Sequence, residues 1–126
     1  MCLIAYKADT LRLVTRMKES GGFIICWKKY LKGTDSDFIS PYRKTRHNYG
    51  VIESNRKGTS KKWVYDKMYV YSGIHVYLNK PIFVLPKDVI IIPVICSLKD
   101  LIGAGCGEAA FTKVLAVKDL QKETTF

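Results

Sequence analysis

The sequence predicts an α+β fold: a single compact domain, residues 1–126, with a predominantly antiparallel β-sheet and one or two short helices. The length of 126 residues is that of one domain, which buries roughly two-thirds of the surface that its unfolded chain would expose. A hydrophobic content of 48% is typical of a globular protein. About six segments have strand patterns and follow one another with little helix between them, which favours antiparallel pairing.

Two strands are predicted near the start of the chain. The first is Leu3 to Lys7, a short apolar segment. The second is Phe23 to Leu31, "FIICWKKYL", which is β-branched and aromatic before it turns basic. This change of composition is typical of a strand that runs from the core to the rim of a sheet.

The segment between these strands, "TLRLVTRMK" at residues 10–18, predicts a helix. Leu11, Val14 and Met17 recur at helical spacing. Asp9 or Thr10 would cap the helix, and the glycine pair at residues 21–22 would end it. The same letters also alternate, so a hairpin strand is the alternative for this segment.

The next part of the chain, up to Lys62, is rich in Gly, Pro, Ser, Asn and Asp and predicts a long loop. Only Phe38 to Ile39 and Tyr49 to Ile52 have extended character. Long loops in compact domains are usually functional or disordered. The aromatic residues of this loop indicate that it is held in place.

The segment Tyr69 to Leu78, "YVYSGIHVYL", alternates as a strand with two distinct faces. One face has the residues of an ordinary core, namely Val70, Ser72, Ile74, Val76 and Leu78. The other face has side chains that are apolar in body and polar at the tip, namely Tyr69, Tyr71, Gly73, His75 and Tyr77.

The last third of the chain predicts two more strands. Val89 to Ser97 is a continuous apolar run, expected to be buried on both faces, in which Pro93 indicates a bulge or an edge position. Gly103 to Gly107 predicts a turn, and Ala109 to Val117 predicts the final strand. Within that strand, Phe111, Lys113 and Leu115 are expected to share one face.

The net charge of +10 is concentrated in one part of the chain. Residues 28–67 contain eleven Lys or Arg and four Asp or Glu, whereas residues 81–126 contain five of each. A local positive potential of this kind attracts anions, phosphate compounds in particular, although a charged run is also the usual form of a solvated surface.

Within this basic, loop-rich segment we predict a phosphate-binding set of Arg43, Arg46 and Arg56, completed by Asn55. The planar guanidinium group meets phosphate oxygens with two parallel hydrogen bonds. The segment matches no P-loop, and the later "GAGCGE" lacks the Lys-Ser/Thr of a Walker motif.

The aromatic face supplies the second half of the predicted site. Tyr71, His75 and Tyr77 would form a platform on which a nucleobase stacks, and Lys113 would complete the pocket if its face meets theirs. A second core face, an oligomer interface or a snorkelling lysine would explain the same residues.

Other chemistries have little support in the sequence. Four cysteines fit no zinc spacing and are expected to be buried or free thiols, and two histidines make a poor metal set, so we expect no metal and no cofactor. No catalytic residues are predicted, and the chain is expected not to be an enzyme. Glu108, just before the last strand, together with "GIHVYL", gives a faint likeness to degenerate ADP-ribosyltransferase folds.

The order of "ICWKKYL", "SPYR", "NYGVIESNR", "SGIHVYL" and "GEAAFTKVLAV" resembles small phage proteins, and most of all the anti-Thoeris sponges that sequester cyclic ADP-ribose isomers. The resemblance spans most of the chain but depends on general spacing. It implies a nonenzymatic homo-oligomer that captures a bacterial immune second messenger at subunit boundaries without cleaving it, and that in some members also holds cyclic oligonucleotides.

Taken together, these observations predict a protein that binds and sequesters a small phosphorylated nucleotide. A nucleic-acid-binding module that uses the same basic loop and a divergent ADP-ribosyl-transferring enzyme are the alternatives. The start of the chain has no secretory pattern, and its longest apolar run falls far short of the roughly 20 residues of a membrane span. We therefore expect a soluble, cytoplasmic protein without membrane contact, in the host-cell cytoplasm if a phage encodes it.

Overall fold

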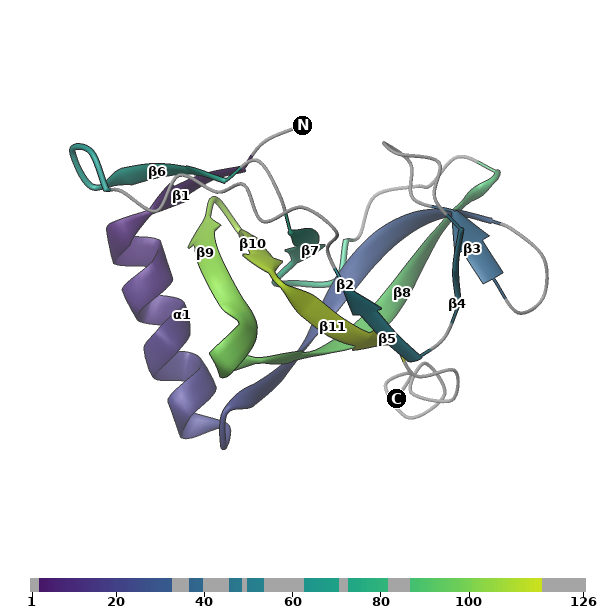
Figure 1. The fold of residues 1–126 in the computed structure, drawn as a ribbon, viewed down its shortest axis with the longest axis horizontal. Coiled ribbons are helices and arrows are strands. Elements are labelled where there is room, and N and C mark those ends of the chain that lie inside the picture. The colour runs from purple at the N-terminus through teal and green to yellow at the C-terminus, as the bar shows by residue number, and fades with distance from the viewer. Residues whose placement is uncertain are drawn as a thin grey trace.

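The computed structural model of the protein describes residues 3–32, 37–39, 46–48, 50–53, 63–70, 73–81 and 87–116. These residues form one α-helix, one 3₁₀ turn and eleven strands (Figure 1). Every strand pairing among them is antiparallel. The predicted α+β class with a predominantly antiparallel sheet is therefore confirmed, although the sheet is cut into more strands than the sequence suggested.

The strands form two sheets. The smaller sheet pairs β1 (Leu3–Tyr6) with β6 (Lys67–Val70). The larger sheet has nine strands, of which seven follow the order β5-β11-β8-β2-β7-β10-β9, while β3 pairs with β2 and β4 pairs with β3. Its strands are β2 (Phe23–Lys32), β3 (Asp37–Ile39), β4 (Arg46–Asn48), β5 (Gly50–Glu53), β7 (Ile74–Tyr77), β8 (Val89–Ser97), β9 (Leu101–Gly105), β10 (Glu108–Phe111) and β11 (Lys113–Ala116).

The helix α1 (Lys7–Glu19) is longer than the sequence pattern predicted, and it excludes the alternative of a hairpin strand. Its buried residues are Leu13 and Met17, whereas Leu11 is 57% exposed. The helix begins after Tyr6 without a side-chain cap. It ends at the predicted glycine pair, where the Gly22 N–H donates to the carbonyl of Met17 at 2.8 Å.

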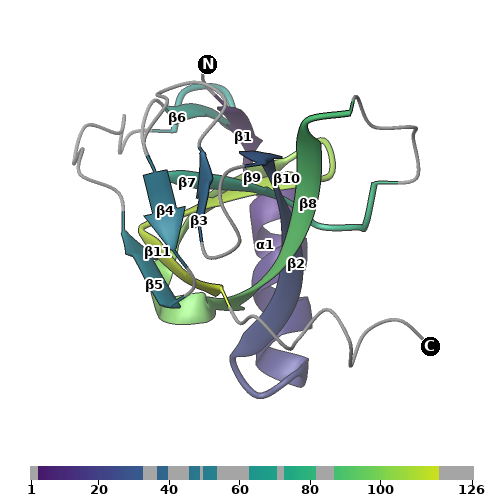
Figure 2. The same ribbon diagram turned by 90° about the vertical axis from the view of Figure 1, so that its right-hand side faces the viewer.

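The main core lies inside the curve of the larger sheet, with α1 closing one end of it. In Figure 2, β2 and β8 lie on the opposite side of this interior from β5 and β11. Alternate residues of each strand point inward, as the two-residue period of a strand requires. The buried members are Leu13, Met17, Ile24, Cys26, Tyr30, Ile52, Ile74, Val76, Ile92, Val94, Cys96, Ala104, Ala109, Phe111, Val114 and Ala116.

A second, smaller cluster lies between the β1–β6 sheet and the outer face of β9 and β10. It consists of Leu3, Ala5, Met68, Val70 and Ala110, with Trp63 and Ile102 packed against it. Two glycines of β9 allow this close approach. A Cβ atom at Gly105 would overlap the carbonyl oxygen of Ile4, and one at Gly103 would lie 2.8 Å from the Cβ of Ala5.

The prediction of one continuous strand from Tyr69 to Leu78 is wrong, because the segment is divided between the two sheets. Tyr69 and Val70 belong to β6, and Ile74 to Tyr77 form β7. Gly73 precedes β7 with φ at +99°, a conformation that side chains rarely adopt. The predicted alternation holds inside each piece, since Val70, Ile74 and Val76 are buried.

The predicted final strand is also divided. It forms β10 and β11 on either side of Thr112, and the inward face changes there, because Phe111 and Val114 both belong to the main core. Phe111 therefore does not share a face with Lys113. The turn predicted at Gly103 to Gly107 is shorter than expected, because β9 runs to Gly105 and only Cys106 and Gly107 turn, with φ at +53° and +79°.

The other predicted strands are present with small changes of length. The strand β8 has the predicted bounds, but it is not buried on both faces throughout: on the face that contains Pro93, only Pro93 is buried, and the other residues are half-buried. Pro93 pairs with Trp27 of β2, and the described pairing of β8 with β11 ends at the next residue, Val94. Within residues 33–62, β3 and β5 match the two predicted extended pieces, whereas β4 was not predicted.

Candidate functional site

Two strands that are distant in sequence bring aromatic side chains together on the outer face of the large sheet. Trp27 of β2 lies directly opposite Tyr77 of β7. Residues opposite each other in an antiparallel pair point to the same face, so the two side chains are neighbours. Both are half-buried, and both belong to the strand positions that alternate with the main core.

His75 and Lys29 extend this pair on the same face. Lys29 follows Trp27 by two residues, and His75 precedes Tyr77 by two. Because β2 and β7 run in opposite directions, both lie on the same side of the Trp27–Tyr77 pair. Both side chains are half-buried. We call the surface formed by Trp27, Lys29, His75 and Tyr77 the β2–β7 face.

The β2–β7 face is part of a row that crosses five strands. Pro93 lies opposite Trp27 on β8, and Glu108 lies opposite Tyr77 on β10. Glu108 in turn lies opposite Gly105 on β9. A carboxylate therefore borders the aromatic pair on one side, while proline borders it on the other.

The predicted base platform is brought together in part. His75 and Tyr77 lie on one face of β7, as expected. Tyr71 lies outside the described residues. Tyr69 belongs to the other sheet, where it is 48% exposed.

The predicted phosphate-binding residues fall largely outside the described part of the chain. This is the case for Arg43, Asn55 and Arg56. Arg46 is placed as a backbone position in β4, opposite Ile39 of β3, which itself lies opposite Leu31 of β2. Its backbone is therefore two strand spacings, about 10 Å, from β2.

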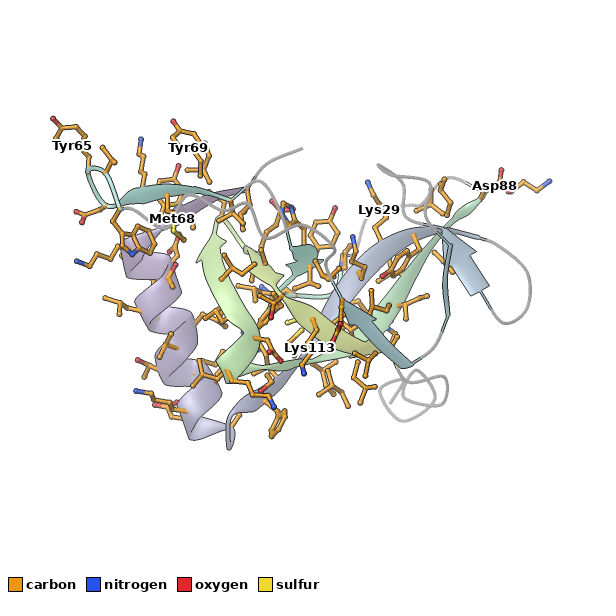
Figure 3. All side chains as sticks on the ribbon, in the orientation of Figure 1. Lys29, Tyr65, Met68, Tyr69, Asp88 and Lys113 are labelled. Atoms are coloured by element: carbon orange, nitrogen blue, oxygen red, sulfur yellow. The ribbon has the colours of Figure 1, made fainter. Side chains whose placement is uncertain are left out.

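Lys113 is not brought to the β2–β7 face. It lies on β11, opposite Glu53 of β5, and β8 and β2 separate β11 from β7. Three strand spacings amount to about 14 Å along the sheet. Figure 3 shows Lys113 and Lys29 pointing away from the molecule in opposite directions. In this structure Lys29 occupies the place beside the aromatic pair that the sequence assigned to Lys113.

Lys28 has the most unusual environment among the residues that the structure describes. Its side chain is 9% exposed, and it is the only buried charged side chain in this part of the protein. The amine lies 5.2 Å from the centre of the Tyr30 ring. Burial, together with the nearby charge of Lys29, lowers the pKa of Lys28 to about 8. Burial also raises the pKa of Tyr30.

The described cysteines are free thiols, as the sequence predicted. Cys26 and Cys96 are buried and Cys106 is exposed. A hydrogen bond with Cys26 and burial raise the pKa of Cys96, so this thiol is protonated at neutral pH. Across the described ranges, no group of three or more His, Cys, Asp or Glu residues is arranged to hold a metal ion.

The residues missed from the sequence are Trp27, Lys28 and Lys29, three consecutive positions of β2. A signal was present in the alternation of this strand, because Ile24, Cys26, Lys28 and Tyr30 share one parity. The partner of Trp27 depends on a long-range strand pairing, which no local pattern indicates.

No protein-family model matches the chain, and no curated protein or solved structure matches it either. In the part of the chain that the structure describes, no helix has the length and apolar character needed to cross a membrane.

Proposed function

We propose that the protein binds a small phosphorylated nucleotide on the β2–β7 face and sequesters it without cleaving it. The single observation that carries this proposal is the direct pairing of Trp27 with Tyr77 on a half-buried face that also holds Lys29. Aromatic side chains provide stacking surfaces for a base, and a nearby cation attracts phosphate. His75 adds hydrogen-bonding nitrogen atoms beside the rings.

The ligand class that we propose is the cyclic ADP-ribose isomers, with cyclic oligonucleotides as a second possibility. These are the messengers captured by the phage anti-defence sponges that the sequence resembles, and the proposed place of action is the cytoplasm. Such ligands carry both flat bases and phosphates, and β2 supplies two described lysines, Lys28 and Lys29, next to Trp27 of the aromatic pair.

The test is capture followed by release. The purified protein is incubated with cyclic ADP-ribose isomers, cyclic oligonucleotides, NAD and DNA, separated from free ligand and then heat-denatured. We expect intact cyclic nucleotide in the released fraction. Tyr77→Ala is expected to weaken capture by about tenfold or more, because loss of one stacked base costs about 1 to 3 kcal/mol. The matched control is Tyr65→Ala, since Tyr65 is 95% exposed and lies on the turn before β6.

The same assay separates the alternatives. Recovery of altered nucleotide would support catalysis and would overturn sequestration. In that case Glu108 is the first residue to replace, with Gln, because it lies opposite Tyr77. Retention of DNA alone, with an affinity that falls steeply as salt is raised, would support a nucleic-acid module instead.

We further propose that the protein is a homodimer through the outer face of β5, β11, β8 and β2. Val51, Leu115, Ile95 and Ile25 lie opposite one another in a single row across these four strands. Val51 is 64% exposed and Leu115 is 37% exposed. An apolar row of this kind on a sheet face is typical of a contact surface.

The charges beside this row favour a second copy of the chain as the partner. Lys113 and Glu53 lie opposite each other next to the row, and among the described residues the structure records no ion pair between them. In a twofold dimer the same patch meets itself, so that each lysine can face the glutamate of the other copy.

Light scattering on a size-exclusion column tests the dimer. We expect the wild-type protein to have twice the mass of the 14.4 kDa chain, and Val51→Lys to have the mass of one chain. Val64→Lys is the control, because Val64 is 54% exposed and lies beside β6 instead. A monomeric wild-type protein at tens of micromolar would contradict the proposal.

A further inference from the structure

The outer face of the β1–β6 sheet is apolar and aromatic, although it faces solvent. Its inner face is buried against β9 and β10. On the outer face Ile4 lies opposite Tyr69, and Tyr6 lies opposite Lys67. An antiparallel sheet with one solvated face usually has polar residues on that face. Here every member except Lys67 is apolar or aromatic, and Ile4 and Tyr69 are 38% and 48% exposed. This composition is typical of a contact surface.

The turn before β6 adds a further ring to this face. Val64 and Lys67 exchange backbone hydrogen bonds of 2.9 and 3.0 Å around a two-residue turn, Tyr65 and Asp66. Both turn residues have positive φ, +52° and +63°, for which Gly and Asn are preferred. Tyr65 is nevertheless 95% exposed. The turn therefore presents a bulky ring to solvent where the backbone favours a small residue, which indicates a role for the ring.

A lysine lies between the two exposed tyrosines. Lys67 and Tyr69 are alternate residues of β6, about 7 Å apart, and Tyr65 precedes Lys67 by two positions. Figure 3 shows Tyr65 and Tyr69 projecting from the same side of β6, and Met68 from the other. The Lys67 amine lies 5.9 Å from the centre of the Tyr6 ring, which holds its charge on the outer face.

The charges around the outer face favour an anionic partner. Asp9 forms an ion pair with Arg12 at 3.1 Å. Among the described residues of β1, β6 and the turn between Val64 and Lys67, this leaves the acidic Asp66 against Lys67 and the adjoining Lys7 of α1. The chain as a whole has a net charge of +10, which attracts a polyanion from a distance.

We propose that the outer face of the β1–β6 sheet binds single-stranded nucleic acid, with bases stacked on Tyr65 and Tyr69 and a phosphate group beside Lys67. Rings that alternate with a cation are the features by which proteins bind single strands, whereas a duplex hides the faces of its bases. The site lies on the smaller sheet and the β2–β7 face on the larger one, so this inference goes beyond the proposed function and does not depend on it.

Fluorescence anisotropy of a labelled oligothymidylate of about twelve nucleotides tests the site. We expect Tyr65→Ala to weaken binding by about tenfold or more, because one stacked base is lost. Tyr65→Phe keeps the ring and is expected to bind as tightly as the wild type. Tyr65→Asn should behave as Tyr65→Ala does, and because asparagine tolerates the left-handed conformation, its effect cannot come from a disturbed turn.

Phe23→Ala is the matched control for loss of an exposed ring. Phe23 is 56% exposed and begins β2, at the far end of α1 from the β1–β6 sheet (Figure 1). The 13 residues of the helix separate the two places by about 20 Å. Phe23→Ala should therefore bind oligothymidylate as the wild type does.

Three results would overturn the inference: a wild type that does not bind oligothymidylate, equal binding by the wild type and the Tyr65→Ala and Tyr65→Asn variants, or equal binding of single strand and duplex. The last would mean that charge alone attracts the nucleic acid. The two proposals can fail separately. Binding of oligothymidylate that depends on Tyr65, without capture of cyclic nucleotide, overturns only the proposed function. Capture of cyclic nucleotide without binding of oligothymidylate overturns only this inference.

Discussion

Replacing Lys28 with methionine is expected to make the protein more stable, by about 3 kcal/mol at pH 7 in a buffer without phosphate. The pKa of Lys28 is lowered from the ordinary value of 10.5 to about 8, mainly because the side chain is buried. This difference measures how much the folded state disfavours the charged amine. Methionine has a similar length and shape and no charge, so it removes the cost without leaving a large cavity.

The pH dependence of this effect has a definite sign. Below pH 8 the amine is protonated in both the folded and the unfolded chain, so the folded state bears the full cost of the buried charge. Between pH 8 and 10.5 the unfolded chain holds a proton that the folded chain has released, and the unfolding free energy of the wild type rises with pH. The advantage of Lys28→Met should therefore shrink by about 2 kcal/mol between pH 7 and pH 10.

Urea denaturation of the wild type, Lys28→Met and Lys18→Met at several pH values between 7 and 10 measures this difference. Other groups titrate in all three proteins, so the difference between wild type and variant isolates Lys28. Lys18 is exposed, and its replacement should change the unfolding free energy by about 0.5 kcal/mol or less at every pH. Two outcomes would contradict the prediction: a difference in unfolding free energy between wild type and Lys28→Met that does not vary with pH, or a Lys28→Met protein that is less stable than the wild type at pH 7. Either would show that a favourable interaction in the folded state offsets the cost of burying the charged amine.

Local alternation predicted the burial of individual residues better than it predicted the strands. In the segment from Tyr69 to Leu78, the residues assigned to the core face and described by the structure are buried or half-buried. The break in that segment comes from tertiary packing. Gly73 has a positive φ, and a Cβ atom there would meet Ile102 at 2.6 Å and the carbonyl oxygen of Phe111 at 3.1 Å. An isolated glycine in an alternating run was the only local sign of it.

Only part of the candidate site could be predicted, because the rest of it also depends on tertiary packing. His75 and Tyr77 could be assigned to one face because they are two residues apart on one strand. Lys113 was assigned to them because its strand was read as continuous and its neighbours were unknown. The sheet order instead brings Trp27 beside Tyr77. Which strands pair is determined by long-range contacts, so sequence patterns alone could not place Lys29 there.

The glycine-rich segment "GAGCG" also has a structural role that its sequence did not reveal. A glycine-rich turn was predicted at Gly103 to Gly107, and a phosphate loop was excluded because the Walker lysine is missing. In the structure, Gly103 and Gly105 lie inside β9, where β1 crosses the outer face of the sheet. Their lack of a side chain is what allows the β1–β6 sheet to pack on β9 and β10.

Gly105→Ala is accordingly expected to lower the free energy of unfolding by about 2 to 3 kcal/mol. Among substitutions that add one methyl group to this protein, it is the one from which we expect the largest destabilisation. The new Cβ would overlap the carbonyl oxygen of Ile4 and lie 2.9 Å from the Cδ2 atom of Tyr6. A backbone oxygen in a paired strand cannot turn aside as the end of a flexible side chain can. Since β1 is paired with β6, both strands must move away from β9 together.

Two measurements distinguish this displacement from a general loss of stability. The first is urea denaturation against Gly107→Ala, where a Cβ meets nothing within 4 Å and only the strain of φ at +79° remains, about 1 kcal/mol. The second is the fluorescence of Trp63, which packs against the cluster under β1 and β6, in a protein that also carries Trp27→Phe. We expect a red-shifted emission in Gly105→Ala under native conditions, because the indole becomes more hydrated. An unshifted emission together with a stability equal to that of Gly107→Ala would mean that β1 does not press on β9 at Gly105.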